Sequence, residues 1–479
     1  MLLSEILAKS GVDNSGLEDR EITGVTCSST QVVPGSLFFA LKGEKTDGHL
    51  FIDDAFSKGA AAVIGENQNV YKTGYLKAAN SRQAYALASA AFFGNPNEAL
   101  KLCGVTGTNG KTTVANMVRS ICLYAGINCG LIGTIENIAG AHHMGAERTT
   151  PGPEVLHQLL REMVDNGDKI CAMEVSSHSL AMERVYGLEF DVGIFTNLTL
   201  DHLDFHKTME AYAQAKAKLM EQSKISVINA DDPAAKLFME KSRSFVSYGI
   251  TNPADLMARN IRCTSESLSF TSSIGEVCLQ PGGRFNVQNA LSAMSAALCL
   301  GIPEKTVLEG INKYTGVAGR MELVPTIGKY SVYIDYAHTP DGLENVLKAL
   351  KEFAPGRVIT VFGCGGDRDR SKRPIMGEIA SNLSDLCVVT SDNPRTEYTW
   401  DIITDIVNGI KNKNFLIEED RKAAIRRALL IANPGDIILL AGKGHETYQT
   451  IGNSNFHMDE RELVAEIEKD IQLHGECNQ

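Results

Sequence analysis

Short apolar runs rich in β-branched residues recur along this 479-residue chain, and they constrain its fold more than any other feature. Each run is followed by glycine or polar residues and then by a helical pattern, which is the sequence form of a repeated β-α unit. The clearest runs are residues 102–106, 170–175, 192–197, 226–229, 331–334, 357–362, 386–390 and 436–441. We therefore predict an α/β fold with parallel sheets, in which ligands bind at the carboxyl ends of the strands.

The length of the chain predicts about three domains of roughly 150 residues each. We place one boundary near residue 98, after the turn-rich segment Phe93-Gly94-Asn95-Pro96. A second boundary is expected near residue 321, where the segment TGVAGR at 315–320 precedes new strands. The predicted domains are residues 1–98, 99–321 and 322–479.

Composition excludes several classes of protein. With 43% hydrophobic and 22% charged residues, the chain is typical of soluble globular proteins, and no apolar run is long enough to insert into a membrane. The N-terminal segment MLLSEILAKS is interrupted by Glu5 and Lys9, so it predicts a short amphipathic helix rather than a signal peptide. A formal charge of −12 disfavours nucleic acid as a partner. Eleven cysteines without a CxxC pair indicate reduced thiols and a cytoplasmic location, whereas oligomeric state is not predicted.

A glycine-rich segment, GTNGKTT, lies between the predicted strand at 102–106 and a helix. In such a loop the glycines let consecutive backbone N–H groups face one anion, and the helix N-terminus adds a partial positive charge. Lys111 is suited to the terminal phosphates and Thr112 to Mg²⁺. We therefore predict that ATP is held by Gly107, Thr108, Asn109, Gly110, Lys111, Thr112 and Thr113.

The loop is a variant of the general phosphate-binding pattern GxxxxGK[ST]. That pattern requires glycine at position 105, where this chain has valine, with glycines at 104 and 107 instead. One alternative is a glycine-rich turn with a surface lysine. Another is a GTPase switch, but the chain has no NKxD segment to read a guanine base, so ATP is favoured.

Three further segments contain Glu174, His202 and Lys216, within MEVSSHSL, TNLTLDHLDFH and AYAQAKAKLM. Each residue alone has an ordinary structural interpretation: a helix-capping carboxylate, a loop imidazole and a solvated lysine. Together, downstream of a phosphate loop, they indicate a catalytic centre.

The motifs GTNGKTT, EVSSH, TNLxxDHLDxH, AKxxL, NxxN at 286–289 and DYAHTP at 335–340 resemble those of the Mur ligase family of peptidoglycan precursor synthesis. The resemblance extends over nearly the whole chain. Within the family, GGDRDRSKRP, SDNPRTE and GKGHE are most similar to the member that adds the third amino acid. The resemblance implies a UDP-muramoyl-binding first domain, a P-loop-type parallel α/β ATP-binding central domain and a Rossmann-like, amino-acid-binding C-terminal domain.

The resemblance also implies an acyl-phosphate mechanism, in which ATP activates the carboxylate of a UDP-N-acetylmuramoyl dipeptide and an amino acid displaces phosphate. It implies that Lys216 is carbamylated, becoming an N6-carboxylysine, and that Mg²⁺ is held by Thr112, Glu174, His202 and Lys216. The implied catalytic set is Lys111, Glu174, His202 and Lys216. Further nucleotide contacts are implied for Asn289, Arg320 and Asp335.

Two more groups of residues match substrate contacts in the family. Those for the UDP-muramoyl dipeptide are Ser29, Thr149, Thr150, Ser176 and Arg184. Departures lie nearby, because the family often has Asp-Ser-Arg where this chain has SST at 28–30, and glutamine where Met182 stands. The alternative for Thr149-Thr150-Pro151 is a helix N-cap with proline in the first turn, and both roles are compatible.

The residues that match amino-acid contacts are Arg368, Asp392, Asn393, Pro394, Arg395, Gly442 and Glu446. A guanidinium forms a two-pronged ion pair with a carboxylate, and meso-diaminopimelate, unlike lysine, has a carboxylate at its far end. Arg395 therefore favours meso-diaminopimelate, with Glu446 suited to an ammonium group. The alternative is a turn with a surface arginine.

Other functions stay open at this point. One is the same ligase acting on L-lysine, and another is a ligase similar to a folylpolyglutamate synthase, which would lack DNPR and the first domain. A binding module that kept the fold without chemistry is a third, although the joint presence of Lys111, Glu174, His202 and Lys216 disfavours it.

Overall fold

The computed structural model describes residues 1–43, 46–264 and 267–476. The chain forms two compact units. One consists of Met1–Leu198, His202–Tyr248 and Ser292–Gly310, and the other of Thr199–Asp201, Gly249–Leu291 and Ile311–Gln479. The predicted domain boundaries near residues 98 and 321 stay predictions.

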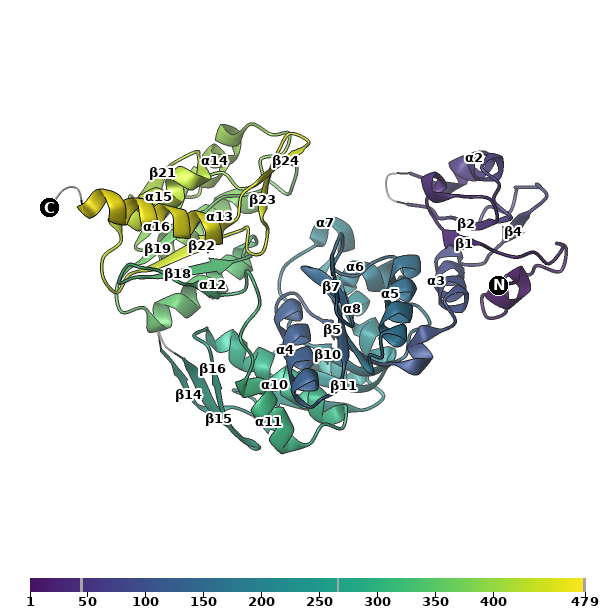
Figure 1. The fold of residues 1–479 in the computed structure, drawn as a ribbon, viewed down its shortest axis with the longest axis horizontal. Helices are drawn as coiled ribbons and strands as arrows, with labels where there is room; N and C mark the ends of the chain where they lie inside the picture. Colours follow the sequence, from purple (N-terminus) through teal and green to yellow (C-terminus); the bar gives the residue numbers. More distant parts are fainter. Residues whose placement is uncertain (44–45, 265–266, 477–479) are drawn as a thin grey trace. The chain divides into compact units, whose positions relative to one another are not determined.

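The N-terminal part of the first unit is a parallel sheet in the order β1-β2-β3-β4 (Figure 1). The expected amphipathic helix at the N-terminus is present as α1, which buries Leu3, Ile6 and Leu7. The elements of this part are α1 (Leu3–Leu7), β1 (Gly24–Thr26), η1 (Ser29–Gln31), β2 (Ser36–Ala40), η2 (Gly48–Phe51), α2 (Ile52–Ser57), β3 (Ala62–Gly65), β4 (Tyr75–Lys77), α3 (Ser81–Phe92) and η3 (Pro96–Ala99).

The rest of the first unit is built on a large sheet, whose strands from β12 onward follow the order β12-β11-β10-β5-β9-β6-β7-β8. The strands are β5 (Lys101–Thr106), β6 (Cys129–Ile132), β7 (Glu136–Ala139), β8 (His142–Gly145), β9 (Ile170–Glu174), β10 (Phe190–Phe195), β11 (Ser223–Asn229) and β12 (Phe245–Gly249). The helices are α4 (Lys111–Tyr124), α5 (Pro153–Asp165), α6 (Ser177–Ala181), α7 (Leu203–His206), α8 (Met209–Glu221) and α9 (Ala235–Glu240). Two further helices, α10 (Arg284–Cys299) and α11 (Glu304–Asn312), belong to the first unit between Ser292 and Gly310 and to the second unit outside that range.

The register of this sheet brings three strand ends together. The parallel strands β10, β5 and β9 are neighbours, with Phe195 opposite Thr106 and Val105 opposite Glu174. Their side chains are almost all buried, because helices cover both faces of a parallel sheet. The residues that follow β5, β9 and β10 therefore meet at one sheet edge, where open α/β sheets place their ligands.

The second unit contains an antiparallel sheet, β14-β15-β16, and a six-stranded sheet in the order β17-β18-β22-β19-β20-β21. In the larger sheet only β17 is antiparallel to its neighbour. The strands are β13 (Leu256–Met257), β14 (Arg259–Cys263), β15 (Leu268–Ser272), β16 (Gly275–Leu279), β17 (Glu322–Val324), β18 (Ser331–Asp335), β19 (Val358–Phe362), β20 (Leu386–Val389), β21 (Phe415–Ile417), β22 (Ile437–Ala441), β23 (Tyr448–Ile451) and β24 (Ser454–His457). The helices are α12 (Pro340–Phe353), α13 (Lys372–Leu383), α14 (Thr399–Val407), α15 (Arg421–Ile431) and α16 (Glu460–Glu476).

Each face of the six-stranded sheet has its own hydrophobic core. One core joins the sheet to α12, α13 and α14, and the other joins it to α15 and α16. The α/β class is confirmed, and all eight predicted runs are strands, with ends that differ by up to three residues.

No helix in the described parts of the chain is long and apolar enough to cross a membrane. The ten cysteines within the described ranges are free thiols, and Cys477 lies outside the described residues.

One buried histidine makes the stability of the first unit depend on pH. His157 lies on α5 with 1% of its surface exposed, and neither ring nitrogen has a hydrogen-bond partner among the described residues. Burial disfavours the charged imidazolium and lowers the pKa of His157 to about 4. Because the unfolded histidine binds its proton near pH 6.5, the stability present above that pH is lost as the pH falls toward 4.

We expect His157→Leu to remove this loss. The free energy of unfolding of the variant minus that of wild type should rise by about 2 kcal/mol when the pH falls from about 7.5 to about 5. Urea unfolding followed by circular dichroism at the two pH values measures the difference. His142→Leu, at an exposed position on β8, is the control and should follow wild type. An identical pH dependence in wild type and His157→Leu would contradict the prediction.

Candidate active site

The phosphate loop connects β5 to α4 at the sheet edge described above. Gly107 and Gly110 have φ angles of 151° and 85°, a region that favours glycine, and α4 begins at Lys111. A Cβ atom on Gly107 would lie 1.9 Å from Thr196 Oγ1. Only glycine fits at this position, and the loop presents its backbone at a helix N-terminus, as an anion site requires.

The end of β10 holds this loop in place. Thr108 N donates to Asn197 O at 2.9 Å, and Asn109 N donates to Asn197 Oδ1 at 2.9 Å. Thr196 Oγ1 donates to Asn109 O at 2.7 Å. Thr196 and Asn197 are supporting residues that sequence reasoning missed, although both belong to the TNLxxDHLDxH motif.

We expect Gly107→Ala to weaken nucleotide binding by about ten- to a hundredfold, since overpacking of this kind costs about 1–3 kcal/mol. Isothermal titration with an ATP analogue measures the change. Gly126→Ala is the matched control, because Gly126 also has a positive φ, but a Cβ atom there would meet nothing within 4 Å. Equal affinities for the two variants would show that the contact with Thr196 does not shape the loop.

Two lysines converge on one carbonyl of the phosphate loop. Lys111 Nζ donates to Gly107 O and Thr108 O, both at 2.9 Å, and Lys216 Nζ donates to Gly107 O at 2.7 Å. Lys216 lies on α8 with 1% of its surface exposed, and its Nζ is 4.4 Å from the centroid of the Tyr212 ring. The solvated-lysine interpretation of Lys216 is therefore wrong, because the side chain is buried against the loop.

Histidines pack beside these lysines. His202 precedes α7 with a φ of 53°, and its ring contacts His178 and Tyr212, with centroids 4.8 and 6.1 Å away. His206 Nε2 lies 2.9 Å from Ser177 Oγ. Burial, followed by the positive charges of His178 and Lys216, lowers the pKa of His206 to about 4, so this ring is neutral at pH 7.

Glu174 ends β9 with 1% of its surface exposed. Its carboxylate accepts hydrogen bonds from Thr134 N at 2.8 Å and Thr134 Oγ1 at 3.0 Å. Thr134 Oγ1 also lies 3.0 Å from Thr149 Oγ1. Glu174 is thus linked to a predicted substrate residue through a threonine that the sequence did not single out.

Four of the five residues predicted for the UDP-muramoyl dipeptide lie around Glu174. Thr150 Oγ1 donates to Glu174 O at 2.8 Å, Ser176 N donates to Thr150 Oγ1 at 3.0 Å, and Arg184 Nη1 donates to Thr150 O at 3.0 Å. Burial, followed by the charges of Arg148 and Arg82, lowers the pKa of Arg184 to about 10. Thr149 is the fourth member.

Ser29 is not joined to this group by the contacts above. It begins η1, and its carbonyl accepts a hydrogen bond from Lys58 Nζ at 2.8 Å.

The helix-capping interpretation of the Thr149-Thr150-Pro151 segment is wrong. The N-cap of α5 is Gly152, and Pro153 occupies the first turn. The Thr150 hydroxyl instead donates to the carbonyl of Glu174 at the end of β9.

The residues predicted to hold Mg²⁺ include a lysine, and the unmodified ammonium group repels a cation. Among the described residues, no group of three or more His, Cys, Asp and Glu side chains is placed to hold a metal ion. Thr112, Glu174, His202 and Lys216 therefore suit Mg²⁺ only if Lys216 supplies an oxygen anion.

The other predicted nucleotide residues lie in the second unit. Asn289 Nδ2 donates to Asn286 Oδ1 at 3.0 Å, and the Arg320 guanidinium lies 4.9 Å from the Tyr336 ring centroid. Asp335 accepts hydrogen bonds from Met321 N at 2.7 Å and Ala337 N at 2.8 Å. Burial raises the pKa of Asp335 and outweighs the opposing effects of Arg320 and these bonds.

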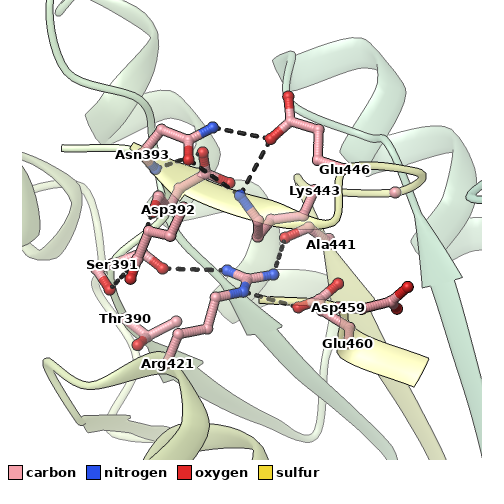
Figure 2. Close-up of polar contacts among 12 residues, drawn as sticks. Thr390, Ser391, Asp392, Asn393, Arg421, Ala441, Lys443, Glu446, Asp459 and Glu460 are labelled. Atoms are coloured by element: carbon pink, nitrogen blue, oxygen red, sulfur yellow. Dashed lines mark hydrogen bonds and ion pairs between the residues drawn. The ribbon is translucent and has the colours of Figure 1, made fainter. Parts of the chain in front are cut away.

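Six of the residues predicted to bind an amino acid follow β20 or β22, among them Asp392, Asn393 and Glu446 (Figure 2), whereas Arg368 follows β19. Arg395 has a φ of 50°, and its Nη1 donates to Gly366 O at 2.8 Å. Gly366 N in turn donates to Asn393 O at 2.9 Å, which joins GGDRDRSKRP to SDNPRTE. Arg395 is half-buried and its guanidinium is anchored to a neighbouring loop, and its contact with a ligand carboxylate stays a prediction beside the alternative of a surface arginine.

The remaining predicted residues lie in the same loops or next to them. Asn393 Nδ2 donates to Glu446 Oε2 at 2.8 Å, and a Cβ atom on Gly442 would lie 2.6 Å from Asp392 Oδ2. Arg368 is exposed, and its Nη1 donates to Asp367 O at 3.2 Å. Pro394 follows Asn393 in the same loop.

Sequence reasoning missed three fully buried cations that bond to the loops carrying these residues or to their neighbours. Arg373 pairs with Glu397 at 2.8 Å and with Asp405 at 2.9 Å. Lys443, in the loop after β22, donates to Asn393 Oδ1 in the loop after β20, and Arg421 donates to Ser391 O in that second loop. Lys443 and Arg373 fall within the quoted motifs, but only the fold brings their partners close.

Family models of Mur ligases match most of the chain: the "Mur ligase family, catalytic domain" at 21–104, the "Mur ligase middle domain" at 105–297 and the "Mur ligase, glutamate ligase domain" at 319–444. A UDP-N-acetylmuramoyl-L-alanyl-D-glutamate–2,6-diaminopimelate ligase from Clostridium tetani is 46% identical over 486 residues, covering 98% of this chain and 100% of the relative. The chain belongs to the Mur ligase family. As a Mur ligase, it is an ATP-dependent amide ligase.

Solved Mur ligase structures share the fold. A structure of a UDP-N-acetylmuramoyl-L-alanyl-D-glutamate–2,6-diaminopimelate ligase has a TM-score of 0.68 at 31% identity and covers 94% of this chain and 95% of its own. MurF ligase from Thermotoga maritima, in complex with ADP, has a TM-score of 0.63 at 20% identity, covering 93% and 97% of the two chains. At that identity the second likeness concerns the fold alone.

Proposed function

We propose that this Mur ligase joins meso-diaminopimelate to UDP-N-acetylmuramoyl-L-alanyl-D-glutamate in peptidoglycan precursor synthesis. The observation that carries the proposal is the anchored Arg395 two positions after Asn393, which bonds to Glu446, so that the loops offer one cation for a carboxylate and one anion for an ammonium group. The name of the 46% identical relative supports the same reaction.

In this proposal the ATP that Mur ligases use binds at the phosphate loop, where α4 begins. The backbone of Gly107, Thr108, Asn109 and Gly110, together with Lys111, Thr112 and Thr113, holds the phosphates. Asn289, Arg320 and Asp335 contribute further nucleotide contacts.

We assign the Mg²⁺ site to Thr112, Glu174, His202 and Lys216. Carbamylation would convert the Lys216 ammonium into a carboxylate, and its burial beside Gly107 O supports a role at the phosphates. When bound, Mg²⁺ supplies charge neutralisation for phosphoryl transfer. Lys111 adds positive charge from the protein at the same loop. The dipeptide carboxylate would then become an acyl phosphate, which the amine of the amino acid attacks.

The dipeptide substrate is assigned to Ser29, Thr149, Thr150, Ser176 and Arg184. Four of these already form one hydrogen-bonded group, which suits an anionic, sugar-rich ligand. We further propose that residues 1–98, 99–321 and 322–479 are the dipeptide, ATP and amino-acid domains, and that the protein works in the cytoplasm without nucleic acid.

The amino acid is assigned to Arg368, Asp392, Asn393, Pro394, Arg395, Gly442 and Glu446. The expected result is that ADP and phosphate are released from ATP only when the UDP-muramoyl dipeptide and meso-diaminopimelate are both present. A coupled ADP assay with an amino-acid panel measures this. Equal or faster turnover with L-lysine would refute the specificity, and no turnover with any amino acid would refute the ligase assignment.

A further inference from the structure

Lys443 is a fully buried lysine that none of the roles above includes. It follows β22, and its side chain has 0% exposed surface. Its Nζ lies 3.0 Å from Asn393 Oδ1 and 3.0 Å from Glu446 Oε2 (Figure 2). The Tyr448 ring centroid lies 5.7 Å away. A buried ammonium group requires such partners, since an unpaired charge in a protein interior is strongly unfavourable.

The two partners of Lys443 are also joined to each other. Asn393 Nδ2 donates to Glu446 Oε2 at 2.8 Å, while Asn393 Oδ1 accepts from both Lys443 Nζ and Thr450 N, the latter at 2.9 Å. These bonds dictate which way the Asn393 amide faces. Glu446 Oε2 therefore accepts from two donors, whereas no hydrogen bond among the described residues uses Glu446 Oε1.

We propose that Lys443 is a positioning residue for the incoming amino acid, acting through Glu446, whose Oε2 also accepts from Asn393. By holding Oε2 of Glu446, it keeps the carboxylate in one orientation and leaves Oε1 available for the ammonium group of the amino acid. With no exposed surface, Lys443 itself does not contact that substrate. The inference rests on the proposed function, which places Glu446 and Asn393 against meso-diaminopimelate.

A purely structural lysine would behave differently. If Lys443 only joined the loop after β22 to the loop after β20, its loss would lower stability and leave the Michaelis constants of the folded enzyme unchanged. A positioning role changes the Michaelis constant of one substrate selectively.

The first test is Lys443→Met, which keeps the aliphatic chain and removes the ammonium group. We expect the KM for meso-diaminopimelate to rise about tenfold or more, as for a lost charged hydrogen bond. The KM values for ATP and for the dipeptide should stay within about twofold of wild type. Lys351→Met is the matched control, because Lys351 forms an exposed ion pair with Asp385 at 2.7 Å in the same unit. An unchanged KM for meso-diaminopimelate in folded Lys443→Met overturns the proposal.

The second test combines Lys443→Met with Glu446→Gln. The double variant removes both charges, so no carboxylate is left facing a missing ammonium group. If Lys443→Met alone fails to fold, the double variant is therefore expected to fold. If Lys443 acts through Glu446, Lys443→Met should raise the KM for meso-diaminopimelate less in the Glu446→Gln background than in the wild-type background, by a factor of about three or more. Where Lys443→Met alone is unfolded, the expected rise in the Glu446→Gln background is less than about threefold. A further rise of about tenfold in the Glu446→Gln background overturns the proposal.

Wild-type kinetics separate the two levels of the argument. If wild type does not use meso-diaminopimelate, the proposed function fails and the inference fails with it. If wild type uses meso-diaminopimelate and the Lys443 variants keep its KM, the positioning role alone is wrong.

Discussion

Lys216→Ala is expected to lower kcat by about a thousandfold, because the carbamylated side chain that would hold the charge-neutralising Mg²⁺ at the phosphates is lost. Bicarbonate should not restore activity, since no amine remains to be carbamylated. Short carboxylic acids should restore it in part by entering the space beside Gly107 O that the buried side chain leaves. Steady-state ADP release with and without acetate measures both effects.

The matched control is Lys218→Ala on the same helix. Lys218 Nζ pairs with Glu183 at 2.9 Å and is 38% exposed, so its loss should leave kcat near wild type. A second readout does not depend on turnover: labelling with ¹³C-bicarbonate should give a carbamate carbon signal in wild type and none in Lys216→Ala. Undiminished activity in Lys216→Ala would remove the lysine from the catalytic centre.

Glu460→Ala is expected to lower the free energy of unfolding of the second unit by about 3–5 kcal/mol, as for a buried ion pair that loses one partner. Arg421 and Glu460 both have 0% exposed side chains and are joined at 2.7 Å. The guanidinium also donates to Ser391 O at 3.2 Å and Ala441 O at 2.9 Å (Figure 2). Without Glu460, the buried guanidinium of Arg421 has these two carbonyls as its hydrogen-bond partners among the described residues.

Urea unfolding followed by the fluorescence of Trp400 measures this loss, because Trp400 is the only tryptophan and lies in the same unit. The control is Glu466→Ala. Glu466 joins the same two helices through Lys422 at 3.0 Å, but both side chains are more than half exposed, so its loss should cost within about 0.5 kcal/mol. Equal losses for the two variants would show that burial does not set the strength of the Arg421 pair.

The predicted strands and the phosphate loop were found because their signals are local. A run such as 102–106 is apolar on both faces, which few structures other than a central parallel strand accommodate. The loop that follows needs glycine at positive φ, and that requirement also appears directly in the sequence. The motifs that resemble Mur ligases are likewise short and contiguous.

The helix cap at Thr149-Thr150-Pro151 was predicted wrongly for the same reason. The residue types suit a cap, but the Thr150 hydroxyl bonds instead to Glu174 O, 24 positions away in sequence. A local preference is overridden where the fold brings a partner from a distant part of the sequence into hydrogen-bonding range. The sequence does not state which segments become neighbours.

The sequence by itself determined the α/β class and the strands, and it predicted the residues of the catalytic and amino-acid sites. Only the tertiary structure decided which side chains support those segments: Thr196 and Asn197 bond to the phosphate loop, and Lys443 and Arg421 bond to the loops after β20 and β22. The physical reason is that a buried polar group must find a partner, and sheet order selects that partner. Because β10 lies next to β5, its last residues hold a loop that begins almost ninety positions earlier.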